Sequence, residues 1–229
     1  MKQVDTLVQK YAETVYEHYK WLHAHPELSG QEKESAAYIA ATLRKIGLEP
    51  IENVGGYGVV AVIEGKGPGK CVGLRADFDA LPIQECTGLP HSSQNPGVMH
   101  ACGHDAHAAM LLGAAYVLNE MRDQFNGSVK LLFQPSEENS ADSGSKRMIA
   151  DGALENPHVD AVIGQHMSPD RAVGTVASKP GPLSAASDRF FITIEGKACH
   201  ASSPHNGVDA LLVGAHVVTA LQRDRKSVV

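Results

Sequence analysis

The sequence predicts an α/β protein, a class in which helices and strands alternate along the chain. Segments whose apolar residues recur at helical spacing alternate with short β-branched runs such as 59–63 and 129–133. These runs are apolar on both faces, which is typical of strands buried in a sheet that helices cover on two sides. Together, the two observations favour a largely parallel sheet between two layers of helices.

The expected elements of the first domain have clear boundaries. Two helices fill the N-terminal region up to Gly47, and Pro26 separates them because proline interrupts a helix. The remaining elements are expected as strands at 59–63, 71–76, 129–133 and 159–163 and as helices at 107–121 and 146–154.

A second set of expected elements begins after the turn-forming segment Pro180-Gly181-Pro182. A strand is expected over 189–196 and a helix over 208–221. We therefore predict two domains, residues 1–185 and residues 186–229.

Composition and charge narrow the class of protein. The chain has 229 residues, of which 43% are hydrophobic and 20% are charged, as in an ordinary folded domain. No apolar run approaches the ~20 residues that cross a bilayer. The net charge of −6, without a long basic tract, argues against nucleic acid and membranes as partners. The start of the chain lacks the features of a secretory signal and the four cysteines lack framework spacing, which predicts a cytoplasmic protein.

A cluster of metal-binding residue types lies in segment 97–107. It contains a thiol, three imidazoles and a carboxyl group just before an apolar run typical of a helix. Cys102 and His104 stand at positions i and i+2, a spacing at which a loop presents both donors to one zinc-like ion. The alternative is a polar loop that caps the helix, with Asp105 favoured by the helix dipole. The density of Cys and His favours the metal site.

Acidic side chains or histidines directly follow three of the predicted strands. They are Asp77 and Asp79, Glu137 and Glu138, and His166. Ligands of parallel sheets bind at the carboxyl ends of the strands. We therefore expect these residues to meet in one crevice with the Cys102 and His104 loop.

The two acidic pairs suggest different tasks. If the strand continues to residue 79, Asp77 and Asp79 project to one face of the sheet. There, one of them binds the metal or orients a ligand imidazole; alternatively, they only form a turn before Leu81-Pro82. Glu137 and Glu138 are adjacent, so their side chains point apart. A metallohydrolase needs one carboxylate as ligand and another as proton acceptor, and an adjacent pair can divide these tasks.

The remaining histidines are mostly interpreted as structural. That interpretation covers His18, His91, His158 and His216. His23 and His25 are left open between helix capping and support of a ligand.

Five ordered motifs extend the metal-site hypothesis over most of the chain. They are HAHPELS at 23–29, LRADFDALPI at 74–83, MHACGHD at 99–105, FQPSEE at 133–138 and GKACHA at 196–201. In this order and spacing, from about Tyr19 to Gln222, the chain resembles the amidohydrolase branch of the dinuclear aminoacylase/carboxypeptidase metallopeptidases. That branch includes hippurate hydrolases, N-acetyl-diaminopimelate deacetylases and plant auxin-conjugate hydrolases.

The resemblance implies a fold and a ligand set. The fold is α/β, with a three-layer mixed sheet and helices on both faces of a zinc-peptidase-like catalytic domain, plus the start of an inserted α+β ferredoxin-like lid domain. The implied ligands of one or two divalent ions (zinc, manganese, cobalt or nickel) are Cys102, His104, Glu138 and His166. Asp77 falls where other branches carry a ligand histidine, so Cys102 is expected to substitute for that histidine.

The resemblance also implies catalytic residues and a reaction. Glu137 is expected as the general base and Asp79 as the orienting carboxylate. His200 sits on the lid, which in dimers reaches into the neighbouring subunit's site to steady the oxyanion. The expected reaction is hydrolysis of a small N-acyl amino acid, hippurate-like or N-acetylated, by water that the metal activates. A full-length member is expected to form a homodimer through the lid.

The chain departs from the family pattern in its length. Family members are longer, with a catalytic domain that resumes after the lid and supplies a last ligand histidine, and residues 223–229 do not continue the pattern. One alternative is therefore a truncated, inactive fragment that only binds metal, with poor solubility because of exposed apolar surface and open sheet edges. Another is a cysteine hydrolase that pairs Cys102 with His104 or His107 and survives chelation but not alkylation.

Overall fold

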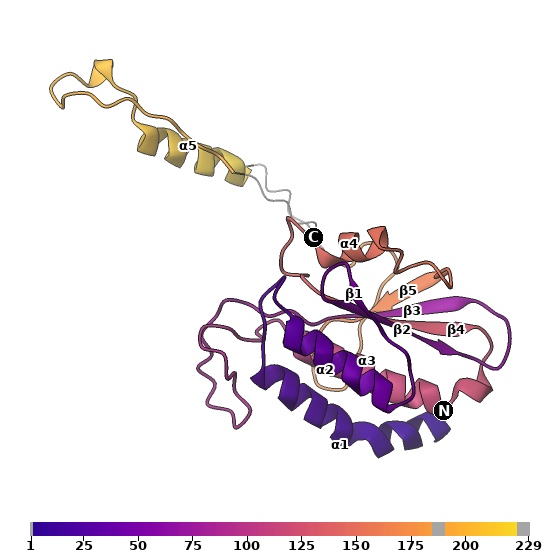
Figure 1. The fold of residues 1–229 in the computed structure, drawn as a ribbon. Coiled ribbons are helices and arrows are strands. Elements are labelled where there is room, and N and C mark those ends of the chain that lie inside the picture. Colours follow the sequence, from indigo (N-terminus) through magenta and orange to yellow (C-terminus); the bar gives the residue numbers. More distant parts are fainter. Residues whose placement is uncertain (1, 185–190, 224–229) are drawn as a thin grey trace. The chain divides into compact units, whose positions relative to one another are not determined.

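The computed structural model describes residues 2–184 and 191–223, and its main feature is a five-stranded sheet (Figure 1). The strands are β1 (Ile51–Val54), β2 (Gly58–Glu64), β3 (Cys71–Asp77), β4 (Ser128–Gln134) and β5 (Ala161–Gly164). Their order in the sheet is β1-β2-β4-β3-β5. β4 therefore lies between β2 and β3, which are consecutive in the sequence.

The sheet is mixed, which confirms the fold that the family resemblance implied, whereas the largely parallel sheet favoured by the apolar pattern was wrong. β3 is parallel to both β4 and β5, whereas β2 is antiparallel to β4 and to β1. The loop after Glu64 returns the chain without a helical crossover, so β3 runs opposite to β2 even though β4 separates them. The apolar pattern could not reveal this direction, because buried strands have the same composition in both arrangements.

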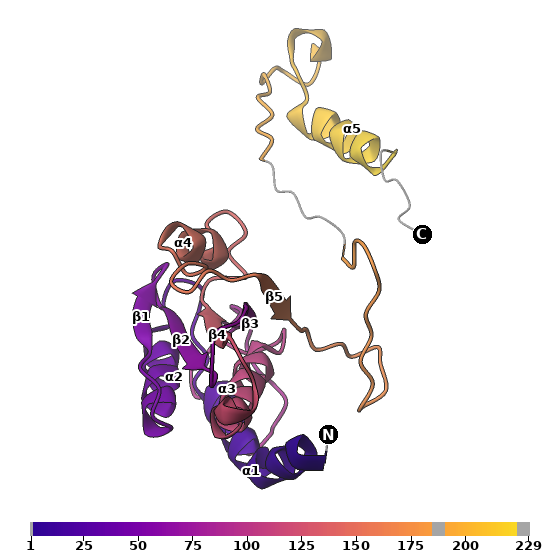
Figure 2. The same cartoon turned by 90° about the vertical axis from the view of Figure 1, so that its right-hand side faces the viewer.

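Helices cover both faces of the sheet, which confirms the three-layer α/β prediction (Figures 1 and 2). The helices are α1 (Lys2–Ala24), α2 (Lys33–Lys45), α3 (His104–Glu120), α4 (Gly144–Ala150) and α5 (Ala210–Arg223), with 3-10 turns at Arg122–Gln124 and Pro204–Asn206. α2 and α3 contact one face, and α1 packs against α3 on the outside. α4 lies on the opposite face, against β4.

The two faces of the sheet bury different amounts of apolar surface. Leu131 and Phe133 of β4 pack with Leu112 of α3 in the larger core, which α1 and α2 also line. The neighbouring residue Leu132 points the other way and packs with Met148 of α4 in a small second cluster. This alternation follows from the two-residue repeat of a strand. The main core therefore lies on the face of the sheet that α3 covers.

Several element boundaries differ from the sequence prediction. α3 begins at His104 rather than at 107, because Gly103, with φ +97°, lets the chain turn directly into the helix. α4 ends at Ala150, earlier than the predicted 154. The short strand β1 was not predicted; three of its four residues are exposed, so its apolar pattern is weak.

The chain divides into two compact units, Met1–Arg171 and Ala172–Val229. The predicted boundary at 185 falls within residues 185–190, outside the described residues, and remains a prediction. Among residues 191–196 no strand is assigned, contrary to the predicted strand over 189–196, whose first two residues are not described. Within the described residues that stretch has no strand partner, and a single backbone bridge joins Lys197 to Val208. The predicted helix over 208–221 corresponds to α5.

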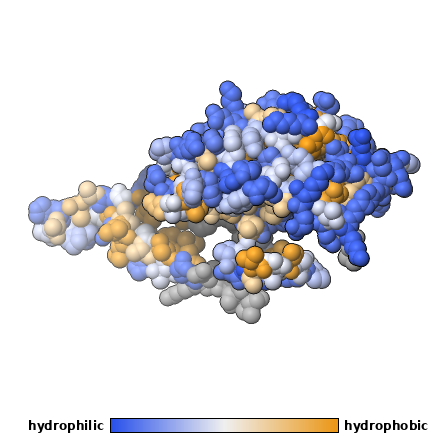
Figure 3. All heavy atoms as spheres, turned by 90° about the horizontal axis from the view of Figure 1, so that it is seen from below, coloured by the Kyte–Doolittle hydropathy of each residue, from blue (hydrophilic) through white to orange (hydrophobic). Residues whose placement is uncertain are grey.

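The described residues of the second unit form no buried core. Most of its described apolar side chains are exposed, including Val173, Val176, Leu183, Phe191 and Leu211. In the first unit the outer strand β5 also exposes Val162 and Ile163. Figure 3 shows a mostly hydrophilic face interrupted by hydrophobic patches. In the described part of the chain, none of the helices combines the length and the hydropathy needed to cross a membrane.

The buried lysine of β4 gives a test of how the second face of the sheet is held. Lys130 is 2% exposed, and its ammonium donates hydrogen bonds to the carbonyls of Glu155 (2.6 Å) and Pro157 (2.9 Å) before β5. Lys130→Met leaves both carbonyls without this donor, so the free energy of unfolding in urea should fall by about 2–4 kcal/mol. The exposed Lys146→Met should change it by less than about 0.5 kcal/mol. Equal effects of the two variants would contradict this role of Lys130.

Candidate metal centre

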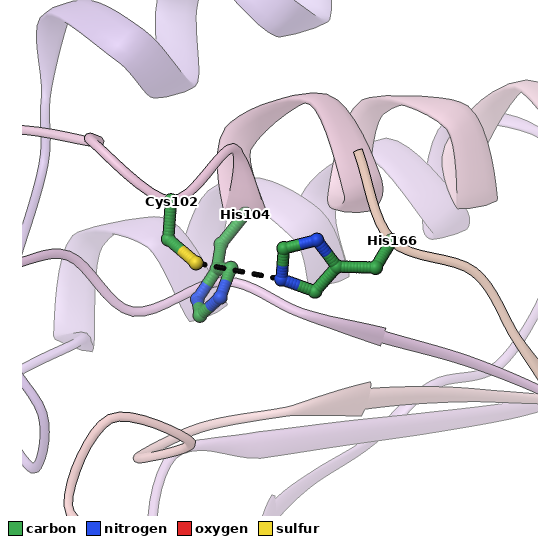
Figure 4. A group of neighbouring side chains, drawn as sticks. All are labelled: Cys102, His104 and His166. Atoms are coloured by element: carbon green, nitrogen blue, oxygen red, sulfur yellow. Dashed lines mark hydrogen bonds between the residues drawn. The ribbon is translucent and has the colours of Figure 1, made fainter. Parts of the chain in front are cut away.

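Three predicted metal ligands meet where the parallel strands end (Figure 4). Cys102 lies in the loop before α3, His104 in the first turn of that helix, and His166 just after β5. The Cys102 Sγ atom is 3.4 Å from Nε2 of His166, and one donor atom from each of the three residues lies within 4.8 Å of the others. The structure therefore brings together donors from two distant parts of the sequence.

His104 is fully buried, and its hydrogen bonds fix which ring nitrogen is free. Nδ1 lies 3.0 Å from the carbonyl oxygen of Asp79 and 3.2 Å from its carboxylate, both of which accept hydrogen bonds. Nδ1 therefore carries the proton, and Nε2 presents its lone pair to the crevice. This Nε2 atom is buried without a hydrogen-bond partner. Asp79 thus has the geometry of an orienting carboxylate.

Oxygen atoms from the acidic residues surround this free nitrogen. His104 Nε2 is 3.7 Å from Oε1 of Glu138, 3.8 Å from Oδ2 of Asp77 and 3.9 Å from Oε2 of Glu137. The Glu138 Oε1 atom is also buried without a hydrogen-bond partner, whereas Asp77 Oδ2 pairs with the guanidinium of Arg75 at 2.7 Å. The Nε2 lone pair of His104 and the Glu138 oxygen therefore lie close together with no proton between them, which is unfavourable unless a cation binds there.

The donor set fits a divalent metal ion. Two ligands of one tetrahedral zinc ion lie about 3.3–3.6 Å apart, given metal–ligand bonds of about 2.0–2.3 Å. The 3.4 Å between Cys102 and His166 falls in that range, and the 3.7 Å between His104 and Glu138 lies just above it. Thiolate, imidazole and carboxylate together suit zinc and its first-row neighbours. The structure thus brings Cys102, His166 and Glu138 close to His104, and the role of these four residues as metal ligands remains a prediction.

The thiol of Cys102 is held in its protonated form when no cation is present. Burial, followed by the nearby carboxylate of Glu138, raises the pKa of Cys102 to about 12. A catalytic cysteine needs the opposite shift. The geometry also opposes the cysteine-hydrolase alternative, since the imidazole within reach of Sγ is that of His166 rather than His104 or His107. A bound metal ion would offset the surrounding negative charge and stabilise the thiolate.

The prediction that the side chains of the two adjacent glutamates point apart was wrong, because one carboxylate oxygen of each lies within 4 Å of His104 Nε2; the two side chains differ instead in exposure. The side chain of Glu137 is 41% exposed and that of Glu138 is 23% exposed. Burial and the charge of Asp77 raise the pKa of Glu137 above its usual value, which suits a group that accepts and returns a proton near neutral pH. Glu138 is tied to the ligand side of the crevice by its backbone N–H, which donates to Asp79 (3.0 Å).

The loop that carries both glutamates is held by a buried carboxylate that the sequence did not single out. Glu32 is fully buried, and its Oε1 accepts hydrogen bonds from the N–H (2.7 Å) and hydroxyl (3.1 Å) of Ser136. Ser136 has φ +51°, an unfavourable conformation for a residue with a side chain. Arg147 donates to the same hydroxyl, and the N–H of Gly144 donates to the Ser136 carbonyl. These bonds fix the loop in its strained form.

His23, whose role the sequence left open, has a structural role beside the site. Its ring contacts Asp105 at 2.6 Å and Glu85 at 3.2 Å and is buried. It therefore joins the end of α1 to the start of α3. His200 belongs to the second unit, where its Nδ1 accepts hydrogen bonds from the N–H (3.2 Å) and the hydroxyl (2.8 Å) of Ser202. Its predicted role at the oxyanion remains a prediction.

The fold and this donor set define an α/β protein with a candidate divalent-metal centre at the carboxyl ends of its parallel strands. Residues 73–226 match peptidase family M20/M25/M40. The chain belongs to that family, which confirms the resemblance found in its motifs.

Relatives and solved structures extend the match. The chain is 50% identical over 201 residues to N-acetyl-L-cysteine deacetylase of Bacillus subtilis, and the matched region is 88% of this chain and 47% of the relative. It is 42% identical over 221 residues to N-acyl-L-amino acid amidohydrolase of Geobacillus stearothermophilus, and here the matched region is 96% of this chain and 59% of the relative. The crystal structure of a dinuclear metal binding M20 peptidase from Bacillus subtilis matches with a TM-score of 0.72 at 41% identity, over 76% of this chain and 48% of the solved one. The chain thus spans about half the length of these relatives.

The loop support by Glu32 can be tested without an activity assay. Glu32→Ala removes the acceptor of two hydrogen bonds, so the loop of Glu138 should loosen and zinc affinity should fall about 10–100-fold, the usual effect of losing a residue that supports a ligand. Glu32→Gln keeps an acceptor oxygen and should retain most of the affinity. Competition with a chromogenic chelator measures both.

The exposed Glu34→Ala serves as the matched control for this experiment, because it removes a carboxylate two residues away from the buried one. It should leave zinc affinity unchanged. If Glu32→Ala bound zinc as tightly as this control, the support assigned to Glu32 would be wrong.

Proposed function

We propose that the protein is a metal-dependent amidohydrolase that cleaves the amide bond of N-acyl amino acids. The observation that carries the proposal is the convergence of donor atoms from Cys102, His104, Glu138 and His166 beside the partly exposed carboxylate of Glu137. Two of these atoms, His104 Nε2 and Glu138 Oε1, are buried without a hydrogen-bond partner. The named activities of the two relatives, deacetylation of N-acetyl-L-cysteine and amide hydrolysis of N-acyl-L-amino acids, support this substrate class.

We propose the following roles for the chain's own residues. A divalent ion held by the four ligands would supply a Lewis acid and would lower the pKa of water. Glu137 accepts a proton from the attacking water, whose oxygen forms a bond to the acyl carbon. Glu137 then returns the proton to the amide nitrogen as the carbon–nitrogen bond breaks, which gives a carboxylate and a free amino acid. Asp79 accepts the Nδ1 proton of His104 and so keeps the Nε2 lone pair free, which would bind the ion.

Further features of the proposal come from the same resemblance. Zinc, manganese, cobalt and nickel are the proposed ions, in one or two sites, because a thiolate, imidazole and carboxylate set accepts any of them. His200 is proposed to steady the oxyanion from the lid, and the full-length protein to form a homodimer through that lid. We propose a cytoplasmic location, with no nucleic-acid or membrane partner, on the charge and composition of the chain.

The proposed base gives a direct test. Glu137→Gln removes the proton acceptor but leaves the four proposed ligands, so kcat for N-acetyl amino acids or hippurate should fall about 10²–10⁴-fold while zinc binding is retained. Release of the free amino acid measures the rate, and the metal content of the dialysed protein measures binding. A variant that retained the wild-type rate would contradict the role of Glu137.

The two alternatives predict different outcomes in the same assay. A truncated, inactive fragment would bind zinc without hydrolysis, while a version extended to the length of the relatives would hydrolyse the substrate. A cysteine hydrolase would retain activity after chelation and lose it after thiol alkylation. The raised pKa of Cys102 disfavours the cysteine hydrolase, and the named activities of the relatives support amide hydrolysis.

A further inference from the structure

One buried histidine beside the metal centre has no role in the proposed reaction. His107 lies one turn after His104 in α3, is 1% exposed, and forms two hydrogen bonds. Its Nδ1 is 2.6 Å from Oδ1 of Asp77, and its Nε2 accepts a hydrogen bond from the backbone N–H of Met167 at 2.9 Å. Met167 follows His166 directly in the chain.

The chemistry of these partners fixes the proton positions on the ring. A backbone N–H only donates, so Nε2 of His107 must be the acceptor and carry no proton. Nδ1 then bears the ring proton and donates it to the carboxylate of Asp77. Both ring nitrogens are thus occupied, and His107 has no lone pair left for a metal ion, although it lies within ligand distance of Asp77 and His104.

The carbonyl group of Met167 is also hydrogen-bonded, to the ring of His166. Nδ1 of the His166 ring lies 2.7 Å from the carbonyl oxygen of Met167, which accepts its proton. That bond leaves the Nε2 lone pair of His166 free, and Nε2 is the atom 3.4 Å from Sγ of Cys102. The orientation of His166 therefore depends on where Met167 lies, and His107 fixes the N–H of that residue.

The turn before α3 provides room for this arrangement. A Cβ atom at Gly103 would come within 3.2 Å of both Cβ and Cγ of Met167. Contacts that close are uncommon, so the glycine lets Met167 pack against the turn between Cys102 and His104. Arg75 also pairs with the second oxygen of Asp77 at 2.7 Å, which leaves the first oxygen directed at His107.

We propose that Asp77 and His107 form a positioning pair that aims His166 at the metal by holding the backbone of Met167. The pair touches neither substrate nor metal. The proposal rests on the proposed function, since it assigns a role only if His166 is a ligand.

The most informative variant is His107→Asn. The asparagine amide reproduces the Nδ1–H donor to Asp77 but is too short to reach Met167, so only the second bond is lost. Zinc affinity, measured by chelator competition, should fall about 10–100-fold. In the metal-free protein the amide hydrogen of Met167 should exchange faster with solvent than in the wild type. The exposed His158→Asn is the matched control and should change neither quantity.

A double-mutant cycle distinguishes positioning from general stabilisation. If His107 acts through His166, His107→Asn should change zinc affinity less than about twofold in a His166→Ala background, because the group it positions is gone. An equal loss in both backgrounds would overturn the proposal, and so would unchanged affinity in the single variant. If His107→Asn does not fold, the isosteric Asp77→Asn takes its place. Zinc affinity should then fall when His166 is present and change little in the His166→Ala background.

Failure of this inference and failure of the proposed function give different results. If wild-type protein bound no zinc and hydrolysed no N-acyl amino acid, the proposed function would be wrong, and with it the role of the pair. If wild-type protein bound zinc while the Met167 amide exchanged equally fast in wild type and His107→Asn, only the positioning pair would be refuted.

Discussion

The candidate metal centre depends on the in-register parallel pairing of three strands. In the pairing of β3 with β4, Asp77 lies opposite Gln134, so both strands end at the same level. In the pairing of β3 with β5, Arg75 lies opposite Gly164, which places His166 two residues beyond that edge. The chain after each strand then enters one crevice. A shift of one residue in either pairing would turn these side chains to the opposite face of the sheet.

Two hydrogen-bonded pairs fasten α3 to this edge of the sheet. Asp77 and Asp79 alternate with Phe78, so both face the helix, and they meet His107 and His104, which lie one turn apart in α3. Asp77 and Asp79, two residues apart in an extended chain, share one face, and His104 and His107, three residues apart, share one face of the helix. Each aspartate can therefore meet one histidine. Burial opposes the charge on Asp77, but the bond from His107 and the charge of Arg75 outweigh it and hold its pKa at about 2. The aspartates therefore remain charged and keep both imidazoles oriented.

Much of this arrangement could be predicted from the sequence, because it follows from local patterns. Apolar runs marked four of the five strands, and the residues after three of them marked the site. The i, i+2 spacing correctly predicted that Asp77 and Asp79 share a face. What could not be predicted depends on long-range pairing: the antiparallel β2, the weak edge strand β1, and the support of Ser136 by Glu32 across 104 positions. Glu32 precedes a helix, where an acidic residue is ordinary, so no local signal distinguishes it. Nor does any local signal pair His107 with the backbone of Met167.

The central claim is that Cys102, a residue far from His166 in sequence, binds the same metal ion. X-ray absorption spectroscopy of the zinc-loaded protein tests it most directly, because sulfur and lighter ligands scatter differently. One sulfur at about 2.3 Å, together with nitrogen and oxygen ligands at about 2.0–2.2 Å, is the expected result. A bound zinc ion surrounded by nitrogen and oxygen alone would contradict the account.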